Sequence, residues 1–200
     1  NILVRQDASV ALVDCDSFQV RVSEKKIYLC TVCTDEFTSF DLAGKDLDNT
    51  ERTENHDRFG LAVLVFYLLM GGKHPFAVAD ASETVINIRE KINKRQFIYT
   101  RNPARGWPKL PPGAQTLDVF PLPVAALFEL AFAPNSDTAG RPPAAAWRST
   151  LTEFRDQLRQ CPSKHCYHPI SLHCPWCKRP KPPAPVVPPK PKTSKKNPKP

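Results

Sequence analysis

The feature that most constrains the fold of this chain is a run of ten apolar residues at positions 61–70. The run lies between Asp57-Arg58-Phe59-Gly60 and Gly71-Gly72. Because it is apolar on all sides and longer than a typical strand, it predicts a helix buried in the centre of a domain. We expect Asp57 to cap the start of this helix. A membrane span would need about 18 such residues, so no span is expected.

Three more segments have the spacing of helices, namely residues 82–92, 123–133 and 142–160. The last of them carries one apolar stripe, which consists of Trp147, Leu151, Phe154 and Leu158. A short strand is expected at residues 10–13, whereas residues 14–56 and 102–122 lack sustained periodicity and are expected to be loops. The sequence therefore predicts a mainly α-helical body led by one strand pair.

The positive charge of the chain is concentrated at its C-terminal end. Residues 178–200 contain eight of the 28 basic residues, nine of the 22 prolines and no acidic residue, so residues 1–177 carry no net charge. Such a segment has too little apolar surface to offset chain entropy, and we expect a disordered, partly polyproline-like tail. Besides a solvated linker, the alternatives are a tail that binds acidic partners weakly and a tail that binds proline-recognition domains.

The seven cysteines do not suit a disulfide framework. Their odd number, without a secretory signal, indicates a reducing and therefore cytoplasmic environment. The chain starts with Asn1 rather than Met, and no charged and then apolar leader follows. We therefore expect a piece of a longer cytoplasmic protein.

Four of the cysteines fall within seventeen residues, together with three histidines. A Cys-x2-Cys turn places two thiolates around one tetrahedral ion, and we predict a zinc site with the ligands Cys161, His165, Cys174 and Cys177. Cys166 or His168 could replace His165 as the fourth ligand. A redox pair and ordinary packing cysteines are the other readings, but Lys-Arg-Pro after Cys177 does not suit the helix that normally follows a redox Cys-x2-Cys.

Six short motifs follow one another in a recognisable order. They are Asn1-Ile2-Leu3-Val4, Asp14-Cys15-Asp16, Ser39-Phe40-Asp41, Asp57-Arg58-Phe59-Gly60, Gly72-Lys73-His74-Pro75-Phe76 and Arg141-Pro142. This order resembles the C-terminal lobe of a eukaryotic-type protein kinase, from the end of the catalytic loop through D-F-G, A-P-E, D-x-W-G and G-x-x-P-F to the arginine that pairs with the A-P-E acid. The segments Asp14-Cys15-Asp16-Ser17-Phe18-Gln19 and Cys174-Pro175-Trp176-Cys177 are similar to the D-x-D-S-F-Q and C-P-W-C motifs of a bacterial kinase-like subfamily.

The resemblance implies a fold class and a division of the chain. Residues 1–160 would form a mainly α, protein-kinase-like C-terminal lobe that lacks its N-terminal lobe. Residues 161–177 would form a small zinc-binding element, and residues 178–200 the basic tail.

The resemblance also implies ATP-dependent phosphoryl transfer to a protein serine or threonine by a longer protein. Asn1 and Asp14 would bind Mg²⁺ with ATP through an amide and a carboxylate oxygen. Asp41 and Arg141 would form a buried structural ion pair. No catalytic residue is expected within this chain, because the catalytic Asp would lie five residues before Asn1.

Two departures from the family pattern weigh against activity. Asp16 replaces the flexible Gly of D-F-G, and Asp41 replaces the longer Glu of A-P-E. The alternatives to an active kinase are therefore a pseudokinase lobe that serves as an interaction scaffold, or a zinc element and basic tail that recruit a protein or nucleic acid. The sequence does not identify the protein substrate.

Overall fold

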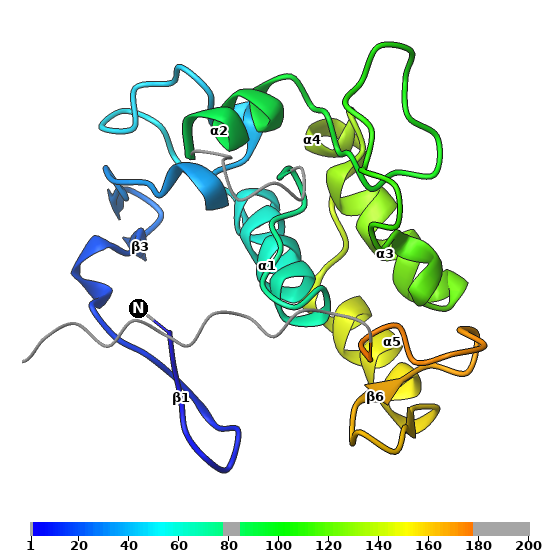
Figure 1. Ribbon diagram of the computed structural model, residues 1–200. Coiled ribbons are helices and arrows are strands. Elements are labelled where there is room, and N and C mark those ends of the chain that lie inside the picture. Colours follow the sequence, from blue (N-terminus) through cyan, green and yellow to red (C-terminus); the bar gives the residue numbers. More distant parts are fainter. Residues whose placement is uncertain (1, 78–84, 178–200) are drawn as a thin grey trace, which may run out of the picture.

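The computed structural model describes residues 2–77 and 85–177. In this part of the chain the helices are α1 (Glu54–Leu69), α2 (Val85–Asn93), α3 (Leu122–Phe132), α4 (Ser136–Ala139) and α5 (Ala144–Asp156). The strands form three separate antiparallel pairs, which are β1 (Ile2–Val4) with β2 (Val10–Leu12), β3 (Val20–Ser23) with β4 (Lys26–Tyr28), and β5 (Arg159–Gln160) with β6 (Cys166–Tyr167). Figure 1 shows α1 in the centre, with the blue N-terminal hairpins on one side and α3 and α5 on the other.

Helix α1 is central to the core, as the apolar run predicts. Phe59 and Phe66 have no solvent exposure, and they pack edge-on against Phe132 and Phe128 of α3 with ring centroids 5.6 and 5.1 Å apart. Such aromatic pairs stabilise a core beyond the area that they bury. The helix is not buried on every face, however, because Leu68 near its C-terminal end is 83% exposed.

The expected cap of α1 is wrong. The helix begins at Glu54, and the capping position belongs to Thr53, whose backbone N–H donates to Nδ1 of His56 at 2.9 Å. Asp57 lies inside the first turn, where its charge is favourable to the helix dipole but caps nothing. Sequence periodicity placed the start too late because residues 54–56 are polar.

The expected helix at residues 142–160 is shorter than predicted at both ends. Helix α5 stops at Asp156, and Arg159 and Gln160 form strand β5, which pairs with Tyr167 and Cys166 of β6. The apolar stripe is real on the helix itself, since Trp147 is 2% and Phe154 9% exposed. Pairing with β6 takes residues 159–160 out of helical conformation, which periodicity alone could not indicate.

Residues 14–56 are not one loop. They contain the β3–β4 hairpin and the short 3-10 turns η1 (Cys15–Ser17), η2 (Asp35–Phe37) and η3 (Phe40–Leu42). In β3 and β4 the alternation of apolar and polar residues is too short, and the segments are too polar, to predict a hairpin from the sequence. A fourth such turn, η4 (Leu117–Val119), lies in the other segment expected to be a loop.

Some predicted features fall outside the described residues. These are Asn1, the first residues of the helix expected at 82–92, and the tail at 178–200. The described part of that helix is α2, whose Ile88 and Ile92 are buried in the core. No helix in the described ranges is long and apolar enough to cross a membrane.

Candidate functional site

Four ligand atoms converge near the C-terminal end of the described chain. They belong to Cys161, His165, Cys174 and Cys177, and all lie within 4.8 Å of one another. Nδ1 of His165 lies 3.7, 3.8 and 3.6 Å from the sulfurs of Cys161, Cys174 and Cys177, and the sulfurs of Cys161 and Cys177 are 3.6 Å apart. Sulfur and nitrogen ligands at ~2.3 and ~2.0 Å from a tetrahedral zinc ion are about 3.5–3.8 Å apart, so the set fits zinc.

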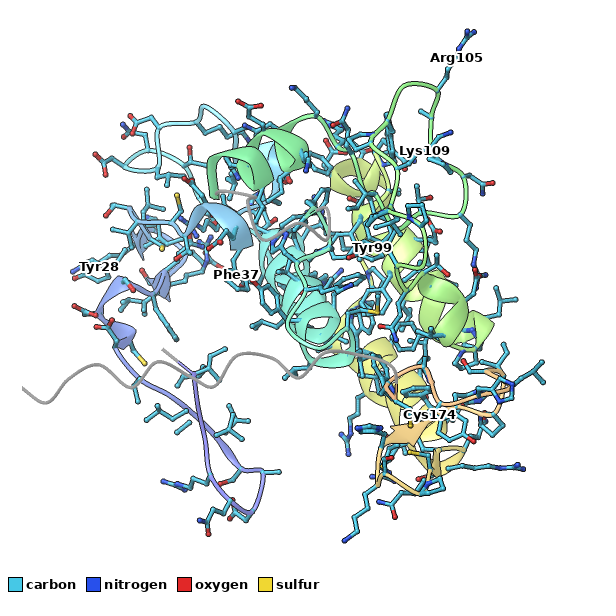
Figure 2. The ribbon with its side chains drawn as sticks, in the orientation of Figure 1. Tyr28, Phe37, Tyr99, Arg105, Lys109 and Cys174 are labelled. Atoms are coloured by element: carbon cyan, nitrogen blue, oxygen red, sulfur yellow. The ribbon has the colours of Figure 1, made fainter. Side chains whose placement is uncertain are left out.

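Two tight turns bring these ligands together. In the β5–β6 hairpin, the backbone N–H of Cys161 donates to the carbonyl of His165 at 3.0 Å, and Lys164 reverses the chain with a φ of 62°. The second turn is Cys174-Pro175-Trp176-Cys177, in which the N–H of Cys177 approaches the carbonyl of Cys174 at 3.5 Å. Figure 2 shows Cys174 in this C-terminal element, beside α5.

The thiols differ in how readily they ionise. Burial raises the pKa of Cys161, but hydrogen bonds from the backbone of His165 and from the thiols of Cys177 and Cys174 outweigh burial and lower that pKa to about 7. The pKa of Cys177 is raised, first of all by its hydrogen bond to Cys161. Part of the Cys161 thiol is therefore ionised near neutral pH, and the thiolate is the form that binds metal.

The structure does not bring the two alternative ligands into this group. Both ring nitrogens of His168 are engaged elsewhere: Nε2–H donates to the side chain of Gln157 at 2.8 Å, and Nδ1 accepts from the N–H of Ile170 at 3.1 Å. Its ring also stacks on Phe154. Cys166 lies exposed on β6. Of the two histidines, His165 is the one that faces the cysteines.

Side chains outside the ligand set hold the second turn in place. The indole N–H of Trp176 donates to the carbonyl of Cys166 at 3.0 Å, which ties the turn to β6. The amide of Gln115 donates to the carbonyl of Pro175 at 2.9 Å. Residues 161–177 are thereby attached to the loop before η4, and no sequence pattern indicates this contact.

Asp41 and Arg141 are in contact, as the sequence predicts. The Arg141 guanidinium has no solvent exposure and donates to Oδ1 of Asp41 at 2.9 Å. Burial alone raises the pKa of Asp41, but the hydrogen bond from His56 and the charge of Arg141 hold it well below its usual range. The ion pair therefore joins η3 to the segment just before α5.

Two further residues complete this network, and sequence reasoning missed both. Nδ1 of His56 accepts from Thr53, so Nε2 carries the proton and lies 2.8 Å from Oδ2 of Asp41. The Asn55 side chain accepts from the N–H of Arg141 at 2.7 Å, while the Asn55 carbonyl accepts from the guanidinium at 2.8 Å. The polar residues at the start of α1 thus serve both as a cap and as partners of the buried ion pair.

His74 ties η2, which contains Glu36, to the loop after α1. It is 2% exposed, its Nε2 lies 2.9 Å from the carbonyl of Glu36, and its Nδ1 accepts from the N–H of Phe76 at 3.2 Å. Burial lowers the pKa of His74 to about 4, although the contact with Glu36 opposes this shift. The imidazole is therefore neutral at physiological pH, with its proton on Nε2.

Asp14, the predicted magnesium ligand, lies two residues after the end of β2. It is exposed and adopts a left-handed conformation, with φ 60° and ψ 50°, directly before η1. Its predicted partner Asn1 is outside the described residues. Asp14 is thus presented at the surface, next to the β1–β2 hairpin.

The side-chain amide of Gln19 anchors the segment that follows Asp14. Its nitrogen donates to the carbonyl of Arg52 at 2.8 Å, and its oxygen accepts from the N–H of Arg52 at 2.7 Å. The last residue of the D-x-D-S-F-Q segment therefore contacts the chain just before α1 through a two-bond bridge. Further along, Leu42 is buried, whereas residues 43–46, 48 and 49 are exposed.

Comparison with known proteins gives two curated relatives. The chain is 35% identical over 184 residues to Protein kinase YegI of Escherichia coli strain K12, and 34% identical to Protein kinase YegI of Escherichia coli O157:H7. The chain is related to bacterial kinase-like proteins. Each alignment covers 88% of this chain and 28% of the relative, so the chain spans little more than a quarter of the length of these relatives.

The other two comparisons are negative. No protein-family profile matches the chain, and no solved structure matches it significantly.

Proposed function

We propose that this chain is the C-terminal lobe of an ATP-dependent protein serine/threonine kinase-like protein, followed by a zinc element at residues 161–177 and a basic tail at 178–200. The observation that carries the proposal is the similarity to Protein kinase YegI over 88% of the chain. The buried Asp41–Arg141 pair supports it, because a pair at these positions suits the ion pair that the kinase resemblance implies.

In this proposal Asp14 and Asn1 bind the magnesium ion that accompanies ATP. A carboxylate and an amide oxygen are hard ligands of the kind that Mg²⁺ prefers. The bound ion would neutralise charge on the phosphate oxygens, which is the main requirement of phosphoryl transfer. Asp14 is exposed just after β2, as a residue that binds a metal–nucleotide complex must be.

The zinc ion has a structural role in this proposal. The ligand set of three cysteines and one histidine leaves no open coordination position for a substrate, which is typical of structural sites. Zinc would fix the β5–β6 hairpin against the Cys174-Pro175-Trp176-Cys177 turn and so hold this element beside α5.

The test uses the full-length protein and its autophosphorylation with radiolabelled ATP. Asp14→Asn removes a carboxylate charge with almost no change in shape, so we expect turnover to fall by at least a hundredfold. Asp48→Asn, which makes the same change in an exposed loop, should leave turnover unchanged. Full turnover by Asp14→Asn would contradict the proposed role of Asp14.

A scaffold function is the second candidate, and Asp16 favours it. A side chain in place of the D-F-G glycine restricts the backbone at a point where kinases need flexibility. If the full-length protein bound Mg²⁺ and ATP but transferred no phosphate, the pseudokinase interpretation would replace the catalytic one.

A further inference from the structure

An apolar groove of about 280 Å³ lies between the end of α1 and the zinc element. Leu68 and Phe120 line it from the lobe, and Tyr167 and Trp176 line it from the zinc element. Leu68 is 83% exposed, which is unusual for a leucine next to two half-buried aromatic rings. Among the described residues the hydroxyl of Tyr167 has no hydrogen-bond partner, so it can donate to a peptide carbonyl.

The chain itself contains a segment with matching chemistry. Residues 182–189 read Pro-Pro-Ala-Pro-Val-Val-Pro-Pro and carry no charge, whereas the lysines at 181 and 190 bound the segment on both sides. Proline-rich segments bind aromatic-lined grooves at a low cost in conformational entropy, because the polyproline II helix is largely formed before binding. An uncharged proline and valine stretch therefore suits this groove better than the lysine-rich remainder of the tail does.

The connection is short enough for the tail to reach the groove. Trp176 and Pro175 line the groove, and residues 178–181 separate Cys177 from the uncharged stretch. Four residues span up to about 13 Å when extended, which is enough to turn back to the adjacent groove. Tethering also gives the segment an effective concentration in the ~mM range, so even a weak contact would be populated.

We propose that residues 182–189 dock in this groove of the same chain, across Leu68, Tyr167 and Trp176. The tail then covers the junction between the lobe and the zinc element. A tail that docks within its own chain competes with other proline-rich peptides for the groove. This proposal is independent of phosphoryl transfer.

The test uses the zinc-loaded 200-residue chain and a fluorescein-labelled peptide of residues 180–192. In a tail variant, Val186→Asp with Val187→Asp, two charges oppose docking and free the groove. Fluorescence anisotropy should show that this variant binds the peptide at least fivefold more tightly than the wild type does. Equal binding by the two proteins, or no binding by the tail variant, would overturn the proposal.

Further substitutions in the tail variant locate the site. Leu68→Asp should abolish peptide binding, and Tyr167→Phe should weaken it severalfold if its hydroxyl donates to the peptide. Leu130→Asp is the matched control, because Leu130 is a 57% exposed leucine on α3 that does not line the groove. Binding lost equally in Leu130→Asp would refute the groove as the site.

Solution studies distinguish the chain's own tail from that of a second copy. Amide resonances of Leu68 and Tyr167 should differ between wild type and tail variant, and the difference should not depend on protein concentration. A concentration-dependent difference accompanied by dimers in analytical ultracentrifugation would mean exchange of tails between copies, and would contradict docking within one chain.

Discussion

Arg141 carries a charge in a fully buried position, and Asp41 compensates it. Removal of one member of a buried pair leaves an uncompensated charge, which typically costs about 3–5 kcal/mol. We therefore expect Arg141→Ala and Asp41→Ala each to lower the free energy of unfolding by roughly this amount in urea denaturation. Arg155→Ala is the control, because the Arg155–Asp156 pair is 70% and 61% exposed and should contribute at most about 1 kcal/mol.

Coupling between the two residues can be measured separately. The double variant should lose less stability than the sum of the single variants, because the second substitution removes the charge that the first left unpaired. Additive losses would mean that the contact between Asp41 and Arg141 contributes nothing to stability.

His74 makes stability depend on pH in a defined window. Its folded-state pKa of about 4 lies below the usual 6.5, so the unfolded chain takes up a proton first as pH falls. The contribution of neutral His74 is complete above pH ~6.5 and is lost progressively towards pH ~4, to a total of up to about 3 kcal/mol.

The measurement compares the wild type with His74→Gln, whose amide can still donate to the Glu36 carbonyl. Urea unfolding at pH 7, 5.5 and 4.5 should show a stability difference that shrinks as pH falls. Acid loss of zinc affects both proteins alike, and the ion pair of Asp41 weakens only at still lower pH because its own pKa is depressed. A difference that stays constant over this range would refute the assignment.

For single residues, sequence analysis predicted a contact only where a family motif contains both of the residues that make it. The kinase resemblance paired Asp41 with Arg141 across a hundred residues of chain. It could not find His56 or Asn55, since polar residues before an apolar run look like an ordinary helix start. His74 was visible as part of a motif, but its contact with Glu36 depends on how the preceding segment packs.

The zinc element gives the clearest test at the scale of secondary structure. Residues 161–177 contain one short strand, β6, and several turns with little core of their own, so metal binding and folding should be one event. We expect one equivalent of zinc per reduced chain. Chelation should increase amide hydrogen exchange throughout residues 161–177 and leave α1 and α3 protected.

Two cysteine variants distinguish the loss of a zinc ligand from a general effect of replacing a cysteine. Cys174→Ser should reduce zinc content to less than half an equivalent, whereas Cys166→Ser, a change of the same kind on exposed β6, should retain the full equivalent. Loss of zinc from Cys166→Ser with retention by Cys174→Ser would mean that the ligand set is wrong.

Element boundaries show why this site was partly predictable. The spacing of cysteines selected Cys174 and Cys177 without help from the fold, because two thiols in one turn must lie close together. The choice of His165 over His168 depends on the hairpin register and on the contact of His168 with Gln157. Neither is encoded in the local pattern, and the same pairing explains why α5 ended earlier than its apolar stripe suggested.

The whole chain, purified alone, should show no ATP-dependent phosphoryl transfer. Its seven glycines include no G-x-G-x-x-G, and no His-Arg-Asp occurs in it, so the parts that cover the phosphates and accept the substrate proton are lacking. Incubation with radiolabelled ATP and a generic protein substrate should give no incorporation above background. Incorporation that disappears in Asp14→Asn would contradict this expectation, because it would show transfer by the chain itself.

For the molecule as a whole, the buried helices and the first strand pair were predictable, and the other two strand pairs were not. Long apolar runs and stripes identify α1, α3 and α5 because each must bury a face. The three hairpins are two to four residues long per strand, and their pairing depends on turns and distant contacts. The β3–β4 hairpin, for example, lies inside a segment closed by the bridge between Gln19 and Arg52.

The Gln19–Arg52 bridge has a practical consequence for protein engineering. The loop of residues 43–51 begins after buried Leu42 and ends at the Gln19–Arg52 bridge, so both of its ends are held in place. Extra residues at its tip would add loop entropy that grows only slowly with length. An epitope tag or a fluorescent reporter could therefore be inserted next to Asp48 without disturbing helix α1, which follows the loop.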